Sequence, residues 1–348
     1  MTKPKRGTWN IEKNDQPPSQ SVDDALNIPA MMQNLRQGND ARNLVMQDAL
    51  DRQEMFQPET PLRSLDDLVV SDVTLAQIRA MLAKVVNHQF LYEQWGLNTI
   101  DPHGGRTAIN LYGPPGTGKS FCAEAIAHAL AMPIIRVNYA EIESKFVGDT
   151  PKNIKAAFAK AKAVNALLFF DEADSILGKR LTNVTQSADH GVNVSRSVML
   201  LELDNFQGVT IFATNLASNY DTAFVRRILG HIEMPLPDHD CRKRLWQYHI
   251  PDKMETEPME MRHLEQLANA TDGLSGGDIL NCVVTAATTA VQRTGRERVV
   301  KMSDFLMAIE QVKKAKQDIG GATPHVTRSV MGIDDLPPDV RQTYNKTQ

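Results

Sequence analysis

The hydrophobic positions in the middle of the chain form short apolar runs separated by helical patterns. Four runs have the length and continuous apolar character of buried strands, and a fifth candidate is shorter: residues 108–112, 134–138, 166–170, 209–214 and 232–234. Helical spacing separates several of them, over residues 120–131 and most clearly over residues 150–163. Strands that alternate with helices predict right-handed βαβ units. We therefore expect an α/β fold with a parallel sheet and helices on both of its faces.

Composition changes at both ends of this region. Residues 1–60 are rich in Gln, Asn, Asp and Pro, which is typical of a largely disordered segment, and an amphipathic pattern begins at Leu65. After Pro237 the pattern is almost purely helical through about Lys316. The chain is therefore expected to hold four parts: a disordered segment at 1–60, an α/β core at 61–237, a small all-α domain at 238–318 and a loosely ordered tail at 319–348.

One stretch of the N-terminal segment differs from its surroundings. Between Ala30 and Met55, hydrophobic residues recur at roughly helical spacing. Two explanations fit this pattern equally well. The helix either docks on its own domain or binds a partner.

Charge and cysteine usage limit the class of protein. The net charge is −4 with 23% charged residues, so no overall basic character points to nucleic acid or to an anionic membrane. The three cysteines form no Cys-x-x-Cys pair, which suits a reducing compartment rather than a disulfide framework. No signal peptide is evident, and the apolar runs are too short to span a bilayer. We expect a cytoplasmic protein without a membrane partner.

Residues 113–120 read Gly-Pro-Pro-Gly-Thr-Gly-Lys-Ser and match the phosphate-loop pattern. Glycines let the backbone aim N–H groups at phosphate oxygens, and the loop is expected to lie between a strand and a helix N-terminus. Lys119 adds positive charge, and the Ser120 hydroxyl can ligate Mg²⁺. The residues expected to bind the nucleotide are Gly113, Pro114, Pro115, Gly116, Thr117, Gly118, Lys119, Ser120 and Phe121.

Polar residues follow the next strand candidates. Asp171 and Glu172 end the run at 166–170, and Asn215 follows the run at 209–214. At the carboxyl edge of a parallel sheet such side chains face the ligand crevice. Asp171 is then expected to hold Mg²⁺ with Ser120, and Glu172 to polarise the attacking water as general base. Asn215 can hydrogen-bond the water and the γ-phosphate.

Two adjacent arginines, Arg226 and Arg227, follow an apolar pair. They are either a solvated surface or the source of a guanidinium for the γ-phosphate of a neighbouring subunit. The spacing favours the second explanation.

In this order, these elements resemble the AAA+ ATPases, over about residues 64–316. Residues 113–120 and 169–174 look like the Walker A and Walker B motifs of that family, Asn215 matches its first sensor, and residues 273–279 are similar to the lid helix of the AAA subgroup. The resemblance implies ATP hydrolysis with Mg²⁺, a hexameric ring and a helical lid at 238–318. It also implies that Leu68–Val70 cover the adenine. Two features depart from the family: the arginines are adjacent, and Asn205 stands where Gly is usual in the segment at 201–206.

Residues 141–150 resemble the first pore loop of AAA unfoldases, with Lys145, Phe146 and Val147 as the substrate-gripping residues. An aromatic side chain offers much contact area at low entropic cost. The alternative is that Phe146 packs in the core, and the polar residues on both sides of it favour the pore loop. A loop at 178–197 is expected where a second pore loop falls, with His190 as an ordinary loop residue.

The resulting prediction is an ATP-driven protein remodeller, a homo-oligomeric ring with a protein substrate and an adaptor as possible partners. A nucleic-acid loader is the alternative, although a basic stripe along the pore and an arginine in the lid are expected of it. A slowly hydrolysing scaffold is the third candidate, and loss of Glu172 or of both arginines would have favoured it.

Overall fold

The computed structural model describes residues 46–101, 104–138, 142, 149–178, 187–215 and 220–319. The chain divides into one unit at residues 1–55 and another at 56–348. In the first unit, residues 46–53 form a helix in which Arg52 and Asp48 make an ion pair at 3.1 Å. The helical pattern is thus confirmed over these residues, the rest of the stretch from Ala30 lies outside the described residues, and the role of this helix stays a prediction.

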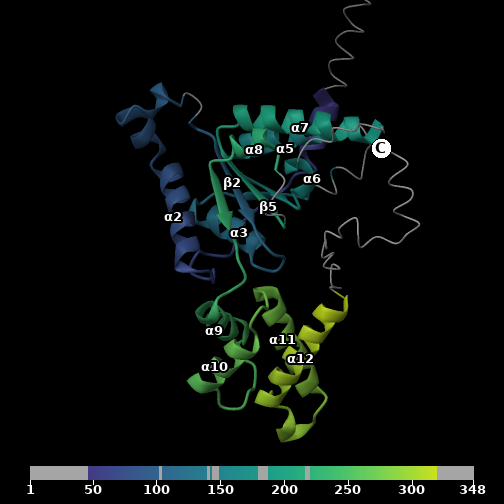
Figure 1. Cartoon of the computed structure of the whole chain (residues 1–348). Coiled ribbons are helices and arrows are strands. Elements are labelled where there is room, and N and C mark those ends of the chain that lie inside the picture. The colour runs from purple at the N-terminus through teal and green to yellow at the C-terminus, as the bar shows by residue number, and fades with distance from the viewer. Residues whose placement is uncertain are drawn as a thin grey trace, which may run out of the picture. The chain divides into compact units, whose positions relative to one another are not determined.

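A six-stranded sheet forms the centre of the second unit (Figure 1), in the order β1-β3-β4-β5-β2-β6. The strands are β1 (Pro58–Glu59), β2 (Thr107–Tyr112), β3 (Ile134–Asn138), β4 (Leu167–Asp171), β5 (Val209–Thr214) and β6 (Gly230–Glu233). All neighbouring strands are parallel except β1, which pairs antiparallel with β3. The expected parallel sheet is confirmed, with each predicted strand displaced by at most two residues.

Helices cover both faces of this sheet. They are α2 (Asp72–Val86), α3 (Lys119–Ala129), α5 (Thr150–Val164), α6 (Asp174–Leu177), α7 (Ser187–Asn205) and α8 (Thr222–Val225), with the shorter turns η2 (Phe90–Gln94) and η3 (Leu97–Thr99) after α2. One buried cluster joins α2 and α3 to the sheet through residues such as Ile78, Ile126 and Leu111. A second cluster joins α5 and α7 to the sheet.

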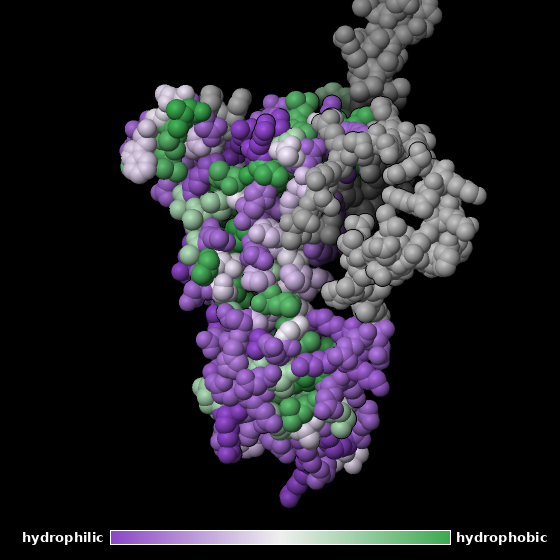
Figure 2. Space-filling model, viewed as in Figure 1, coloured by the Kyte–Doolittle hydropathy of each residue, from purple (hydrophilic) through white to green (hydrophobic). Residues whose placement is uncertain are grey.

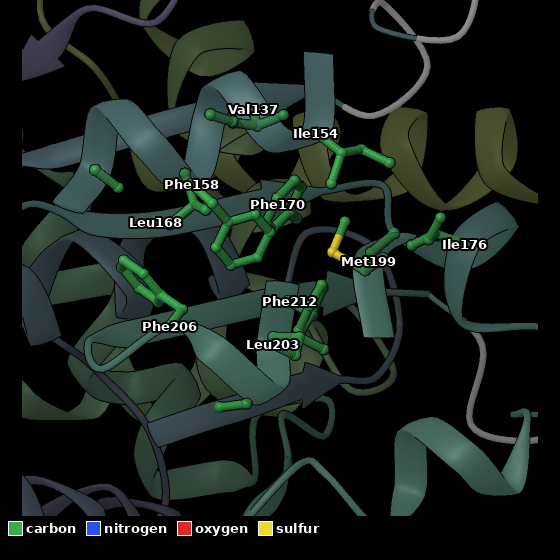
Figure 3. Close-up of a cluster of buried hydrophobic side chains, with 14 of the residues drawn as sticks. Val137, Ile154, Phe158, Leu168, Phe170, Ile176, Met199, Leu203, Phe206 and Phe212 are labelled. Atoms are coloured by element: carbon green, nitrogen blue, oxygen red, sulfur yellow. The ribbon is translucent and has the colours of Figure 1, made fainter. Parts of the chain in front are cut away.

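Aromatic rings make up much of the second cluster (Figure 3). Phe170 of β4 stacks on Phe212 of β5 with ring centroids 5.3 Å apart, and Phe158 of α5 meets Phe206 edge to face at 5.2 Å. All four side chains are buried. Since each buried aromatic removes about 150–250 Å² from water, the packing of these rings stabilises β4 and β5.

The prediction of a loop over residues 178–197 is wrong from Ser187 onward, because α7 begins there and His190 therefore belongs to a helix. The first half of α7 is polar and lacks a helical hydrophobic pattern. Its second half contributes Met199, Leu200 and Leu203, which are buried in the cluster against α5. Tertiary packing thus stabilises a helix that the local sequence pattern does not predict.

The prediction of disorder up to residue 60 is also wrong at its end. Phe56 is buried in the core, and β1 covers the edge of the sheet at β3. The segment that follows is held by Glu124 of α3, whose carboxylate accepts hydrogen bonds from the backbone N–H groups of Leu62 and Arg63 and from Arg136. Burial raises the pKa of Glu124, but these hydrogen bonds and the arginine charges outweigh it and lower the pKa overall.

The expected helical domain follows Pro237. It comprises α9 (His239–His249), α10 (Met261–Ala270), α11 (Gly276–Val291), the turn η4 (Gly295–Glu297) and α12 (Met302–Ile319). Trp246 is fully buried at its centre, edge to face with Phe305 at 5.5 Å. The tail predicted after residue 318 lies outside the described residues apart from Ile319. Among the residues that the structure describes, no helix has the length and apolar character to cross a membrane.

Candidate active site

The candidate residues lie at the carboxyl ends of three neighbouring strands, β4, β5 and β2, at one edge of the sheet. In the sheet β5 lies between β4 and β2, and all three run in the same direction. The phosphate loop therefore leaves β2 beside Asn215 at the end of β5, and Asp171 and Glu172 lie one strand further along. Two backbone hydrogen bonds join these ends: Gly113 N–H donates to Thr214 at 3.3 Å, and Ala173 N–H donates to Ala213 at 3.0 Å.

The loop from Gly113 to Gly118 has a backbone conformation that its glycines make possible. Gly113, Gly116 and Gly118 have φ angles of 147°, 76° and 93°, which residues with a Cβ rarely adopt. A Cβ at Gly113 would lie 2.2 Å from the Met234 carbonyl oxygen. Gly118 is the N-cap of α3, so the loop leads directly into a helix N-terminus, where backbone N–H groups and the helix dipole favour an anion.

Lys119 is buried at the start of α3. Its ammonium group donates to the carbonyl oxygens of Gly113 and Pro114, both at 2.9 Å. Burial lowers the pKa of Lys119, and the carboxylates of Asp171 and Asp174 oppose that shift. The loop thus contains a cation that already bonds to oxygen atoms.

Ser120 and Asp171 meet as the sequence predicts. The Ser120 hydroxyl donates to Asp171 Oδ2 at 2.9 Å, and Asp171 Oδ1 accepts the Glu172 backbone N–H at 2.9 Å. A hydroxyl and a carboxylate are the oxygen ligands that Mg²⁺ uses in sites of this kind. The pair therefore fits the divalent cation expected beside a bound nucleotide.

Glu172 and Asn215, at the same edge of the sheet, are exposed. Glu172 has φ = 52°, an uncommon left-handed conformation for a residue with a Cβ. Such local strain occurs at functional sites, where the surrounding structure maintains it. Asn215 is fixed through its backbone N–H, which donates to Asp174 Oδ1 at 3.1 Å.

A cavity of about 660 Å³ lies between this edge and the helical domain. It is lined by Pro115 through Phe121, Asp171, Glu172 and Asn215, and by Leu68–Val70. Gly113 and Pro114 do not line the cavity. Their carbonyl groups accept hydrogen bonds from Lys119. Within the described residues, the structure therefore brings the phosphate-loop, acidic and asparagine candidates to one place.

The helical domain supplies one wall of the cavity, as expected of a lid, but sequence reasoning did not single out the residues that form this wall. Its lining residues are Cys241, Leu245, Tyr248, His249, Gly276, Gly277 and Leu280, and Arg63 and Asp67 line it from the core. Gly277 N–H donates to the Gly116 carbonyl oxygen at 3.0 Å, so α11 begins against the phosphate loop. Burial lowers the pKa of His249, and a hydrogen bond to the Gly276 backbone opposes that shift. The sequence signal for this wall was the stretch at residues 273–279, which resembles the lid helix of the AAA subgroup.

The two arginines have different environments. Arg227 donates to both carboxylate oxygens of Asp204, at 3.0 and 2.9 Å, and Arg106 binds the same carboxylate at 2.7 Å. Arg226 is exposed, and its side chain has no hydrogen bond or ion pair within the part of the chain that the structure describes. Neither arginine lines the cavity of its own chain.

The segment that precedes both arginines is nevertheless held against the end of α6. Asp221 N–H donates to the Leu177 carbonyl oxygen at 2.9 Å, and Tyr220 forms a β-bridge with Gly178. Leu177 and Gly178 end α6, the helix that follows Glu172. The predicted pore-loop residues Lys145, Phe146 and Val147 lie outside the described residues.

Replacement of Gly116 tests the fit between loop and lid. In Gly116→Ala the backbone φ stays near 76°, and the new Cβ lies 2.5 Å from Ser275 Oγ, which caps α11. Because this clash pushes the lid away from the phosphate loop at the nucleotide cavity, we expect ADP affinity to fall at least about tenfold. Titration with a fluorescent ADP measures it. Gly273→Ala is the matched control, since Gly273 has the same φ and open space around it. Unchanged affinity in Gly116→Ala would contradict the contact.

Fold and site together define a phosphate-loop nucleotide-binding protein with a helical lid. The comparisons with known proteins name the family. The chain matches the model "ATPase family associated with various cellular activities (AAA)" over residues 109–236, and the model of the AAA+ lid domain over residues 263–307. The chain belongs to the AAA+ ATPases.

Its similar proteins include two archaeal proteasome-activating nucleotidases. That of Methanopyrus kandleri is 33% identical over 270 residues, which cover 76% of this chain and 59% of the relative. That of Aeropyrum pernix is 33% identical over 269 residues, covering 74% and 63%. The 26S proteasome regulatory subunit 4 homolog B of Arabidopsis thaliana is 30% identical over 285 residues, covering 79% and 61%. The chain thus spans about three fifths of the length of these relatives.

Proposed function

We propose that this chain is an ATP-hydrolysing protein remodeller that acts as a homo-oligomeric ring. One observation carries the proposal. The groups needed for nucleotide hydrolysis meet at one edge of the sheet, while the exposed Arg226 lies outside the cavity of its own chain. Such a site binds a nucleotide alone and becomes complete only beside a second copy.

The cavity fits ATP with Mg²⁺. Its volume of about 660 Å³ lies within the range of small-molecule sites. The N–H groups of the loop and the Lys119 ammonium group bind the phosphates, and Leu68–Val70 cover the base together with the lid residues Tyr248 and His249. Ser120 and Asp171 hold the metal ion, which adds positive charge at the phosphate oxygens.

Hydrolysis uses the two exposed polar side chains at this edge. The Glu172 carboxylate accepts a proton from the water that attacks the γ-phosphate, and Asn215 orients that water by a hydrogen bond. Lys119 stabilises the charge that develops on the phosphate oxygens. The products are ADP and inorganic phosphate.

Arg226 supplies the remaining charge, in the site of a neighbouring copy. Arg227 is engaged by Asp204, which anchors the segment and leaves the adjacent guanidinium facing solvent. A guanidinium delivered in trans accelerates phosphoryl transfer by about 10³–10⁵-fold. This assignment supports a ring of several copies, and we propose a hexamer, as in the family.

A polypeptide is the proposed cargo. The relatives are named for activation of the proteasome, which supports a protein substrate over a nucleic acid. Lys145, Phe146 and Val147 are the proposed grip on that polypeptide, and an adaptor can present it. We propose a cytoplasmic location, because ATP is available there and the three cysteines are buried free thiols, as suits a reducing compartment.

Replacement of Phe146 separates hydrolysis from remodelling. Because the aromatic ring is proposed to contact cargo and not nucleotide, Phe146→Ala should keep ATP turnover within about twofold of wild type and reduce cargo unfolding at least about tenfold. Loss of fluorescence from cargo fused to a green fluorescent protein measures unfolding. Phe146→Tyr is the control that keeps the aromatic contact. Full unfolding activity in Phe146→Ala would contradict the pore-loop assignment.

An ATP-locked ring identifies the cargo. The Glu172→Gln variant, loaded with ATP in lysate of the native host, should retain its polypeptide for mass spectrometry. The recovered protein should be released when Phe146→Ala is added. Recovery of nuclease-sensitive nucleic acid without an enriched protein would contradict the remodeller and favour a loader.

A further inference from the structure

Three chain segments meet at Tyr220, shortly before the turn that leads to the two arginines. The hydroxyl groups of Tyr220 and Thr214 share a hydrogen bond of 2.6 Å. The Tyr220 backbone forms a β-bridge with Gly178, the residue after α6. Thr214 ends β5 directly before Asn215, and α6 begins two residues after Glu172. Tyr220 therefore contacts both segments that carry the exposed polar side chains of the site.

Thr214 connects Tyr220 to the phosphate loop as well. Its side chain is fully buried, and its carbonyl oxygen accepts the Gly113 N–H at 3.3 Å. The residue before Asn215 thus has its backbone bound to the phosphate loop and its hydroxyl bound to Tyr220. Because a buried group in a close-packed interior cannot shift alone, a displacement of Asn215 also displaces the groups that contact Thr214.

The Tyr220 ring is held by packing that does not involve its hydroxyl. It packs against the buried cluster of α5 and α7, and it lies near His231 of β6 with ring centroids 6.3 Å apart. His231 in turn faces Asn110 of β2, with side-chain nitrogens 3.5 Å apart. Replacement of Tyr220 by Phe therefore removes a hydrogen bond and keeps the ring contacts.

A single capped turn connects Tyr220 to Arg226. Asp221 is the N-cap of α8, and its carboxylate accepts a backbone N–H group of that turn at 2.9 Å. Phe224 anchors the turn, since its side chain is fully buried, and the Arg226 N–H donates to the Thr222 carbonyl oxygen at 3.2 Å. Because the turn is both capped and anchored, a shift of Tyr220 moves Arg226 with it.

The outer side of this turn is exposed. Val225 and Leu229 are 43% and 51% exposed, and Arg226 between them is exposed as well. Figure 2 shows hydrophobic atoms among hydrophilic ones over the part of the core where Figure 1 labels α7 and α8. The segment thus has one side buried against the site of its own chain and another side that faces outward.

We propose that Tyr220 is a positioning residue that couples Asn215, at the nucleotide of its own chain, to Arg226, which acts on the nucleotide of the next copy. The inference rests on the proposed hydrolysis in trans. A γ-phosphate bound by Asn215 fixes the end of β5, and the hydrogen bond between Thr214 and Tyr220 then fixes α8. An occupied site therefore favours the position of Arg226 that serves the neighbouring site.

Removal of one hydroxyl at a time tests the positioning role. Tyr220→Phe and Thr214→Val are each expected to lower kcat at least about fivefold, with ADP affinity within about twofold of wild type. Because both remove the same hydrogen bond, the double variant should lose no more activity than either single variant. Thr214→Ser keeps a hydroxyl and should retain at least about half of the wild-type kcat. Phosphate release measures kcat.

Tyr112→Phe is the matched control. Tyr112 pairs with Thr214 in the register of β2 and β5, and its hydroxyl has no hydrogen bond among the residues that the structure describes. This variant should hydrolyse ATP at the wild-type rate. Titration with a fluorescent ADP shows that each variant is folded. An unchanged kcat in Tyr220→Phe, or losses that multiply in the double variant, would overturn the positioning role.

A mixture of variants separates the two ends of the coupling. Arg226→Ala chains supply a working site, and Glu172→Gln chains keep ATP bound and supply the arginine. Tyr220→Phe added to the Arg226→Ala chain tests the link to Asn215, and the same change added to the Glu172→Gln chain tests the link to Arg226. We expect each placement to lower the recovered activity at least about threefold.

The outcomes of the mixture distinguish the coupling from hydrolysis in trans. Full recovery with Tyr220→Phe in both placements, or a loss in only one placement, overturns the link between the two sites while the shared site stands. A mixture of Arg226→Ala and Glu172→Gln chains that recovers no activity overturns the arginine in trans, and the coupling with it.

Discussion

Glu172→Gln is expected to bind ATP with wild-type affinity and to hydrolyse it at least about 100-fold more slowly. The amide keeps the size of the carboxylate but cannot accept the proton of the attacking water. The phosphate loop and the Ser120–Asp171 pair are untouched, because Glu172 is exposed and joins Asp171 only through its own backbone N–H. Single-turnover release of phosphate measures the rate, and a fluorescent ATP analogue measures the affinity.

An acid outside the cavity gives the matched control. Glu233 at the end of β6 is exposed and does not line the cavity, so Glu233→Gln should hydrolyse ATP at the wild-type rate. A wild-type rate in Glu172→Gln would instead exclude Glu172 as the general base. Weaker ATP binding with an unchanged single-turnover rate would show that Glu172 contributes to the binding of ATP and not to the chemical step.

Arg226→Ala is expected to lower the hydrolysis rate by about 10³-fold, with nucleotide affinity unchanged. The reason is its proposed role in trans. The guanidinium is exposed and lies outside the cavity of its own chain, and we propose that it acts on the nucleotide of a neighbour. Arg227→Ala should lower the rate less. Its removal breaks the ion pair with Asp204, which is about a third exposed, and leaves Arg226 in the chain.

Mixing two inactive variants tests the shared site. Lys119→Ala lacks the cation of the phosphate loop but keeps Arg226, whereas Arg226→Ala keeps the loop. Together they should recover part of the wild-type activity, because some sites then combine an intact loop with an intact arginine. For the same reason, specific activity of the wild-type chain should rise with protein concentration. No recovery, with concentration-independent turnover, would contradict an arginine that acts in trans.

Much of the site was predictable because phosphate chemistry requires particular residues at particular spacings. Gly116 and Gly118 are needed where φ is positive, and Lys119 and Ser120 must follow the last glycine at the helix N-terminus. Asp171 was predictable because a buried strand that ends in acids can place them only at its carboxyl edge. The hydrogen bond from Ser120 to Asp171 confirms that these two groups meet.

Other features depend on contacts between distant residues and were mispredicted or missed. The polar N-terminal half of α7 is helical because its other half packs against α5. The identity of the lid residues in the cavity, such as Tyr248 and His249, depends on how α9 and α11 meet the phosphate loop. Glu124 anchors backbone groups some sixty residues away in sequence, which no local pattern reveals.

The sequence alone determined the parallel α/β core, the helical lid and the positions of the candidate site residues at the ends of β2, β4 and β5. Each of these follows from local rules: hydrophobic period, glycine conformation and the direction of parallel strands. Only the tertiary structure distinguished the environments of the two arginines, because Asp204 on α7 engages Arg227 and leaves Arg226 exposed. It alone also revealed which large hydrophobic side chains stay exposed, Trp95 and Val284 among them, since exposure of a hydrophobic side chain depends on every element packed around it and not on its neighbours in sequence.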